Sequence, residues 1–474
     1  MARTTPVHSG YTILSGAGTG TNGSRIDVWA EYKLGASDAA ANTTPITLYF
    51  YAALAKGNTS STKYSSGLNS TLTVDGKAGT RVTNGSYDFT NTATLNLLGS
   101  FSGNIAHNAN GAKTVTITGS FTTKSSYISG GTLSATVTLP TIPRESTVGA
   151  SAANIGETTT ISVNRKNTAY THSIAYSFGA LSGYISEDWE HSDTEVKLTD
   201  VSIAFTVPES FYAQIPNDPT GICTLTIRTY SGNTQIGDEK NCTFTVTAAN
   251  CSPLVTGTVT DVNEKTLTLT GSAKVLIKGH SNACCVIDAT AQRSASIVTK
   301  RIGGAVVTEN ERTINGIDTA NILFYAEDSR GYSAQRAAEG ISFVEYIPIS
   351  DRSECKRIDP TSGKALLAVA GDWFNGSFGD ADNLLLVTYS INGGEEQNVE
   401  ISTDGNFYSA TVELVGLDYT KSHTVAVTVT DCLESETRAL TVNRGIPVFD
   451  WGPGDFRFNV PVYAPQFITS EEET

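Results

Sequence analysis

The chain has 474 residues, of which 39% are hydrophobic and 17% are charged. This composition supports packed cores and excludes a disordered protein, and the length allows about three to five domains. Residues 1–140 contribute +4 and the remaining residues −19 to the net charge of −15, and an acidic body excludes nucleic-acid binding because it would repel a phosphate backbone.

The N-terminal segment MARTTPVHSGYTILSG (1–16) lacks the apolar centre of a signal peptide, and no run approaches the roughly 18 apolar residues of a membrane span. We therefore expect neither secretion by the usual route nor membrane insertion. Uncharged Ser, Thr, Gly and Asn take the place of the charged residues that helical surfaces favour. This substitution predicts an all-β fold.

Residues 1–141 are predicted to form a distinct β-sandwich with a jelly-roll-like or lectin-like outline. HNANG (107–111) precedes the alternating run KTVTITGSF (113–121), and its Asn-Gly pair favours a turn with positive φ. Four further strand-like runs are SRIDVWAEYKL (24–34), ITLYFYAAL (46–54), TATLNLLGSFSGNI (92–105) and GTLSATVTLP (131–140).

Three aromatic residues of this domain, Trp29, Tyr49 and Tyr51, are candidates for a glycan-binding surface, and Tyr49 and Tyr51 share one strand face. Sugar C–H faces stack on aromatic rings while the hydroxyls find polar partners. Alternating aromatics on a strand also form cores, so both interpretations stay open. The +4 charge suggests the anionic polymers of Gram-positive cell walls as a ligand.

Prolines divide the rest of the chain at near-constant intervals. Pro143, Pro253, Pro348 and Pro447 each follow a β-rich run, and their separations are 110, 95 and 99 residues. A repeat of about 100 residues matches an immunoglobulin-like sandwich. We predict an extended array of domains joined by proline-stiffened connectors. It comprises Ig-like domains at 142–250, 251–346 and 347–445 and a C-terminal extension at 446–474.

Local patterns add three expectations. In the stretches 322–335 and 425–442, apolar residues alternate with other residues on both sides of a turn that contains acidic residues. This pattern predicts corresponding hairpins in two domains. TLTLTGSAKVLIKG (266–279) alternates around a Gly-Ser turn and predicts two strands. Cys223 and Cys242 flank a predicted hairpin, but an odd count of seven cysteines without CxxC spacing favours free thiols.

Several stretches resemble minor structural proteins of siphophages, the tailed bacteriophages with long non-contractile tails that mostly infect Gram-positive hosts. The similar stretches are IAHNANGAKTVTITGSF (105–121), TVTLPTIPRES (136–146), YAEDSRGYSAQ (325–335), FNGSFGDADNLLLVTYSINGG (374–394) and GIPVFDWGPGDFRFNVPV (445–462). The resemblance implies a virion component of the tail tip or a tail fibre, assembled with other virion proteins in the host cytoplasm. A cell-wall adhesin and a capsid-surface fibre are the alternatives.

Catalytic motifs are incomplete, and the resemblance implies neither catalytic residues nor cofactors. IDPTSGKA (358–365) has Ile358 where a phosphate loop needs glycine, and is better explained as a surface turn. GHSNA (279–283) lacks the second glycine of a nucleophile elbow. A wall-degrading glycosidase would need two carboxylates at a fixed separation, and SEDWEHSD (186–193) is better explained as a solvated loop. We expect a non-enzymatic protein.

One acidic loop could hold a metal. GDADN (379–383) places Asp380 and Asp382 on one side of a loop before a strand. Their oxygen atoms suit calcium, although the twelve-residue pattern of a dedicated site is missing. The dispersed histidines, without HExxH spacing, argue against zinc.

The closing segment RGIPVFDWGPGDFRFNVPVYAP (444–465) is rich in aromatic residues, yet too little chain follows to close another sandwich. Its rings either fold back on the domain at 347–445 or meet the same segment of other subunits. Winding three copies around an axis would bury several apolar side chains, so we favour a homotrimer. The side chains concerned are Trp451, Phe456, Phe458 and Val460.

Overall fold

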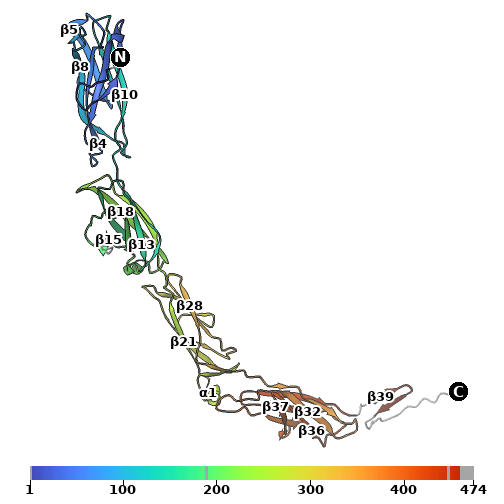
Figure 1. Cartoon of the computed structure of the whole chain (residues 1–474). Helices are drawn as coiled ribbons and strands as arrows, with labels where there is room; N and C mark the ends of the chain where they lie inside the picture. Colours follow the sequence, from blue (N-terminus) through green and yellow to red (C-terminus); the bar gives the residue numbers. More distant parts are fainter. Residues whose placement is uncertain (1–2, 187–190, 446–448, 459–474) are drawn as a thin grey trace, which may run out of the picture. The chain divides into compact units, whose positions relative to one another are not determined.

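The computed structural model describes residues 3–186, 191–445 and 449–458, and its regular structure is almost entirely strand (Figure 1). The predicted all-β fold of tandem sandwiches is confirmed. The chain forms two compact units, Met1–Ala249 and Asn250–Thr474, and each unit contains two sandwiches. Within the described ranges, no helix is long and apolar enough to cross a membrane.

The first sandwich (12–138) packs two antiparallel sheets of order β1–β3–β4–β8 and β2–β10–β9–β5–β6, with β7 paired to β5. In β9, Val115, Ile117 and Phe121 point into the core while the intervening residues point outward. The strands are β1 (Thr12–Ser15), β2 (Ala17–Thr19), β3 (Ile26–Leu34), β4 (Thr43–Leu54), β5 (Lys63–Val74), β6 (Lys77–Ala78), β7 (Gly85–Asp88), β8 (Leu95–Ala106), β9 (Thr114–Thr122) and β10 (Gly130–Thr138).

The sequence located this sandwich's main strands correctly. The four predicted runs correspond to β3, β4, β8 and β10, and the run at 113–121 corresponds to β9. Gly111 takes a φ of 79°, as the Asn-Gly turn predicts.

The second sandwich (147–247) packs sheet β11–β13–β17 on sheet β12–β20–β18–β14–β15–β16, with β19 paired to β18. Cys223 lies opposite Phe244 and Cys242 lies opposite Leu225, and both cysteines are free thiols, as expected. Its elements are β11 (Thr147–Ala150), β12 (Ala153–Asn154), β13 (Thr158–Asn164), β14 (Tyr170–Phe178), β15 (Leu181–Ile185), β16 (His191–Ser192), β17 (Ser202–Thr206), the 3-10 helix η2 (Glu209–Gln214), β18 (Thr220–Ser231), β19 (Thr234–Gln235) and β20 (Lys240–Thr247).

The third sandwich (254–344) has sheets β21–β23–β26 and β25–β24–β27–β28, and a parallel pair β22–β29. Its core contains Phe324, Ile302 and Cys285. Its elements are β21 (Leu254–Asp261), α1 (Glu264–Thr270), β22 (Val275–Ile277), β23 (Ala283–Thr290), β24 (Ile297–Ile302), β25 (Ala305–Val307), β26 (Glu311–Ile314), β27 (Leu323–Asp328), β28 (Ser333–Ala337) and β29 (Ser342–Val344).

The prediction of two strands at 266–279 is wrong for its first half, which forms the helix α1. Asn263 caps this helix by accepting the backbone N–H of Lys265 at 3.0 Å, and Gly271 ends it with a φ of 65°. Seven residues make only about two turns, so no apolar 3.6-residue period can develop. The second half does contain the strand β22.

The fourth sandwich (350–442) packs sheet β30–β32–β36–β35, with β31 paired to β32, on sheet β34–β33–β37–β38. Val369, Tyr408 and Val427 lie in its core. Its strands are β30 (Ser350–Asp351), β31 (Glu354–Arg357), β32 (Ala365–Asp372), β33 (Leu386–Ile391), β34 (Gln397–Asn398), β35 (Ser402–Asp404), β36 (Phe407–Leu414), β37 (His423–Thr430) and β38 (Ser435–Val442).

The two hairpins predicted to correspond do so. The strands β27 and β28 form the last hairpin of the four-stranded sheet in the third sandwich. The strands β37 and β38 do the same in the fourth. Each turn starts with an aspartate, Asp328 or Asp431, whose Oδ1 accepts two backbone N–H groups of its own turn. The same local chemistry therefore closes both domains.

The C-terminal segment contains a hairpin of β39 (Phe449–Gly452) and β40 (Asp455–Phe458). Trp451 pairs with Phe456 across it, and Phe449 pairs with Phe458. Val460 and Pro447 lie outside the described residues.

Candidate functional site

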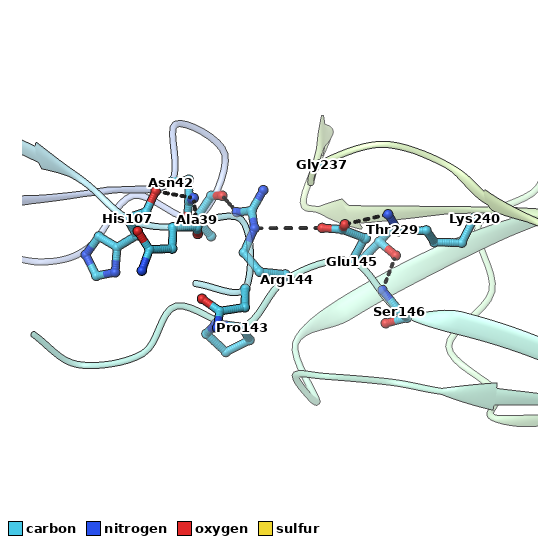
Figure 2. A network of polar contacts seen from close by, with 12 residues as sticks. Ala39, Asn42, His107, Pro143, Arg144, Glu145, Ser146, Thr229, Gly237 and Lys240 are labelled. Atoms are coloured by element: carbon cyan, nitrogen blue, oxygen red, sulfur yellow. Dashed lines mark hydrogen bonds and ion pairs between the residues drawn. The ribbon is translucent and has the colours of Figure 1, made fainter. Parts of the chain in front are cut away.

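The connection between the first and second sandwiches is held by a polar network around Arg144 and Glu145 (Figure 2). Nη1 of Arg144 donates to the carbonyl oxygen of Ala39 at 2.6 Å, and its Nε lies 3.7 Å from Oε2 of Glu145. Oε1 of Glu145 lies 2.8 Å from Nζ of Lys240. Burial alone would raise the pKa of the Glu145 carboxyl, but the hydrogen bond from Lys240 helps to bring it below its usual value. One residue thus binds the first sandwich and its neighbour binds the second.

We call this connector, residues 142–146, the first joint. Its backbone is hydrogen-bonded to both sandwiches. The N–H of Ile142 donates to the carbonyl oxygen of Gly111 at 3.0 Å. The N–H of Ser146 donates to Oγ1 of Thr229 at 2.9 Å. The first joint is therefore a bonded connection between two sandwiches and not a loose linker.

Ser146, the last residue of the first joint, forms a serine–histidine pair with His172 of β14. Oγ of Ser146 is 2.9 Å from Nε2 of His172, a distance that suits a nucleophile and its base. Both residues are fully buried, however, so no substrate reaches the serine. Burial, followed by the charge of Arg165, lowers the pKa of His172 to about 4, which keeps the imidazole neutral. The pair therefore has a structural role.

This pKa predicts that the second sandwich loses stability as the pH falls from about 6.5 to about 4. Over that range an unfolded histidine binds a proton that folded His172 rejects, so protonation favours unfolding. In His172→Gln this part of the pH dependence should disappear. Urea unfolding of the full chain at several pH values in this window gives the free energy of unfolding. If this free energy changes with pH equally in the wild type and in His172→Gln, the prediction is contradicted.

The third and fourth sandwiches meet at a second joint, built around the buried Tyr346 (3% exposed) just after β29. Its ring lies 4.8 Å from that of His280 in an edge-on contact, 5.9 Å from Phe374 and 6.3 Å from Phe378, measured between centroids. Leu433 joins the same apolar cluster. An apolar contact of this kind restricts the movement of one domain on the other.

Polar bonds surround this aromatic cluster. The Tyr346 hydroxyl donates to Oδ2 of Asp431 at 3.0 Å, and Nδ2 of Asn383 donates to the same oxygen at 2.9 Å. Burial, with the nearby Asp431 and Glu434, raises the pKa of Tyr346, so its hydroxyl stays a donor. Nε2 of His280 lies 3.2 Å from Oε1 of Glu434. The second joint is thus apolar inside and hydrogen-bonded at its edge.

The calcium candidates Asp380 and Asp382 lie in the loop between β32 and β33, which docks on α1. The N–H of Ala381, between them, donates to the carbonyl oxygen of Leu269 at 3.0 Å. In the described part of the chain, no group of three or more His, Cys, Asp or Glu side chains is placed to hold a metal. The loop has a clear role in the second joint, and nothing tests the weaker alternative from the sequence, calcium binding by its two aspartates.

The motif-like stretches have structural roles too. Residues 358–365 form the predicted surface turn, in which Oδ1 of Asp359 accepts the N–H of Thr361 at 2.9 Å. In the stretch 279–283, the hydroxyl of the buried Ser281 donates to Oδ2 of Asp261 at 2.6 Å. Of the predicted loop at 186–193, residues 187–190 lie outside the described residues, whereas His191–Ser192 form the short strand β16, which pairs with β15.

Trp29, Tyr49 and Tyr51 do lie together, on the face of β3 and β4 opposite the main core. Trp29 is 1% and Tyr51 7% exposed, and their ring centroids are 5.4 Å apart. The Arg3 guanidinium lies 4.6 Å above the Trp29 ring, and His8 stacks on Tyr49 at 4.3 Å. Glycan binding here stays a prediction, and it would require the N-terminal segment to move away.

That N-terminal segment is fixed by a buried carboxylate. Glu31, whose side chain is fully buried, accepts the backbone N–H of Val7 at 2.6 Å and that of His8 at 3.2 Å. Nδ1 of His8 also contacts Glu31. A buried charge is costly unless it is hydrogen-bonded, so these bonds hold the segment over the aromatic cluster.

An open groove of about 750 Å³ lies elsewhere on the first sandwich, between β5, β7 and β8. Tyr64 (45% exposed) and Leu97 (48% exposed) are on its rim, and the Tyr64 ring lies 5.3 Å from that of Tyr87. Lys63 and Asp88 form an ion pair of 2.8 Å at one side. Hydrogen bonds from Lys63 and Thr90 lower the pKa of Asp88 to about 2, so it stays ionised.

Sequence patterns did not reveal this groove. Tyr64 stands in KYSSG without an aromatic neighbour on its strand face. At this groove the register of β5 on β7 shifts between Tyr64 and Leu68, where three residues of β5 oppose one of β7. A sign of such a bulge in the sequence is Gly67, because glycine tolerates the positive φ of 103° that the structure has there.

Residues 21–370 match the model of a siphovirus protein family of unknown function, DUF859. The chain belongs to this siphovirus family. The match covers most of the chain: most of the first sandwich, the first joint, all of the second and third sandwiches and the start of the fourth. No protein with curated annotation matches the sequence.

Three of the solved structures that align with this siphovirus protein contain several domains or modules. Chicken CNTN1 FN1–FN3 is 9% identical over 65% of this chain and 97% of its own, with a TM-score of 0.22. Clostridium thermocellum CbhA fibronectin(III)-like modules are 12% identical over 42% of this chain and 95% of their own, with a TM-score of 0.15. Extracellular domains 3–5 of Drosophila OTK are 9% identical over 64% of this chain and 98% of their own, with a TM-score of 0.17.

Family membership supports the coarser part of the sequence-based expectation. A siphovirus family and a string of β-sandwiches suggest a structural protein of the phage.

Proposed function

We propose that this siphovirus protein is a non-enzymatic component of the phage tail, at the tail tip or in a tail fibre. There it acts as a spacer and contributes to attachment to the host surface. It is assembled with other virion proteins in the cytoplasm of the infected cell.

The observation that carries this proposal is the construction of the two joints. A spacer holds its ends in position only if neighbouring domains do not swivel. Domains within one chain move relative to each other by default, unless their contact is large and apolar or otherwise fixed. The first joint fixes its domains through Arg144 and Glu145, and the second through the ring of Tyr346. Each joint therefore contributes what a spacer needs.

Immunogold labelling of intact phage particles with antibodies against the chain tests the location. Gold at the distal tail would support the proposal. Gold on the head would overturn it in favour of a capsid-surface fibre, and unlabelled particles would exclude a virion role with exposed epitopes.

Self-association through the C-terminal segment is the second part of the proposal. A two-stranded hairpin such as β39–β40 is marginally stable in water unless it packs on another surface. Phe458, 49% exposed within the chain, offers part of such a surface, and three copies would shield it mutually. We expect the full chain to sediment as a trimer and a chain ending at Asn443 as a monomer. Equal sedimentation of both would contradict this.

A further inference from the structure

We propose that the groove beside Tyr64 on the first sandwich binds an uncharged saccharide chain of the host surface. The inference rests on the attachment role proposed above and names its ligand class and its site. It moves the candidate glycan site away from Trp29, Tyr49 and Tyr51, which are covered in this structure.

The groove presents an apolar platform to solvent at its rim. Below the rim it is lined by Leu68, Val82 and Tyr87, of which Leu68 and Tyr87 are each only 2% exposed and so support the rim instead of contacting a ligand. Tyr64 and Leu97 stand above them on the rim and are about half exposed. The C–H face of a pyranose ring stacks well on such a tyrosine, and its edge then lies over the apolar lining.

Polar groups stand beside this platform, as a sugar's hydroxyls require. The lining includes the hydroxyl residues Ser65, Ser86 and Thr94. The register shift also places residues 65–67 of β5 outside the regular ladder with β7, so their backbone is not committed to strand pairing there. Bulges of this type occur beside binding sites because they re-aim side chains and backbone groups.

Charge decides between classes of wall polymer. Among the residues that line the groove, only Lys63 and Asp88 are charged, and they form an ion pair of 2.8 Å. Their charges cancel, so an anionic polymer such as teichoic acid finds no unbalanced cation in this groove. The +4 charge of residues 1–140 therefore does not act here, and an uncharged saccharide is the favoured occupant.

The experiment uses the full chain on an array of uncharged hexose and N-acetylhexosamine oligosaccharides, with purified wall teichoic acid as the anionic arm. We expect binding to at least one uncharged oligosaccharide that is unchanged when the salt concentration is raised. Tyr64→Ala should weaken it roughly tenfold or more, equivalent to about 1.4 kcal/mol. Leu97→Ser is a second variant that should weaken it, in case the first disturbs folding.

Tyr419→Ala is the matched control, because Tyr419 is an exposed tyrosine (39%) on the fourth sandwich and should leave binding unchanged. The proposal is overturned if no uncharged glycan binds, if binding is confined to teichoic acid and lost at high salt, or if both groove variants bind like the wild type. A change in the sedimentation of Tyr64→Ala would instead identify a protein occupant. Immunogold location is read separately, so a failure here leaves the tail proposal standing.

Discussion

Replacing Tyr346 by alanine should destabilise the second joint by about 3–5 kcal/mol, the cost of removing a large buried aromatic side chain. The ring contacts His280, Phe374 and Phe378, and the alanine variant leaves a cavity where these side chains meet. Denaturant unfolding of the full chain measures the loss, and hydrogen exchange locates it. Protection should fall in 374–383 and 431–434 and stay unchanged in the first unit.

Tyr346→Phe is the control that separates packing from hydrogen bonding. It keeps the ring but removes the hydroxyl that bonds to Asp431, whose Oδ2 still accepts from Asn383. The expected cost is about 1 kcal/mol, typical of one hydrogen bond. If the alanine variant costs no more than the phenylalanine variant, the ring does not hold the joint, and the main support for a fixed spacer in this unit is lost.

The sequence predicted what depends on local periodicity. Alternation located β3, β4, β8, β9 and β10, because one face of each strand must be apolar to form the core. The turns at Asp328 and Asp431 were recognisable as repeats, because an aspartate that caps its own turn needs only neighbours in sequence. Helix α1 was missed because seven residues are too few to show a helical period.

What the sequence could not predict are contacts between distant parts of the chain. Tyr346 and Asp431 are 85 residues apart and belong to different sandwiches, so no local pattern relates them. The strand-face pattern did bring Tyr49 and Tyr51 together, but nothing marked residues 3–8 as the cover of this cluster. That cover depends on Glu31, an acidic residue that reads as surface in the sequence and lies fully buried in the fold.

The sandwiches, which local patterns predict, and the joints and groove, which depend on distant contacts, have different parts in the proposed function. The β-sandwiches themselves are recognisable from their sequence, and many unrelated proteins share them. The joints and the Tyr64 groove depend on individual residues, and they carry the proposals about spacing and attachment. Experiments that perturb a joint or the groove are therefore more informative than experiments on a sandwich core.

For the first joint, Gly111→Ala should cost about 2–4 kcal/mol, combining backbone strain and a steric clash. Gly111 has a φ of 79°, and a Cβ there would overlap the carbonyl oxygen of Ile142, a backbone atom that cannot rotate away. Relieving the clash should move Ile142 and break its N–H bond to the Gly111 carbonyl. Urea unfolding gives the cost, and faster hydrogen exchange at 142–146 reports the opened joint.

Gly57→Ala is the matched control for this change. Gly57 has a φ of 82° in the same sandwich, but a Cβ there has no neighbour within 4 Å. The control carries the strain of positive φ alone, about 1 kcal/mol. The difference between the two variants therefore measures the close approach of the connector to the HNANG turn. Equal costs would mean that the connector yields freely, which would argue against a fixed first joint and against the spacer role that depends on it.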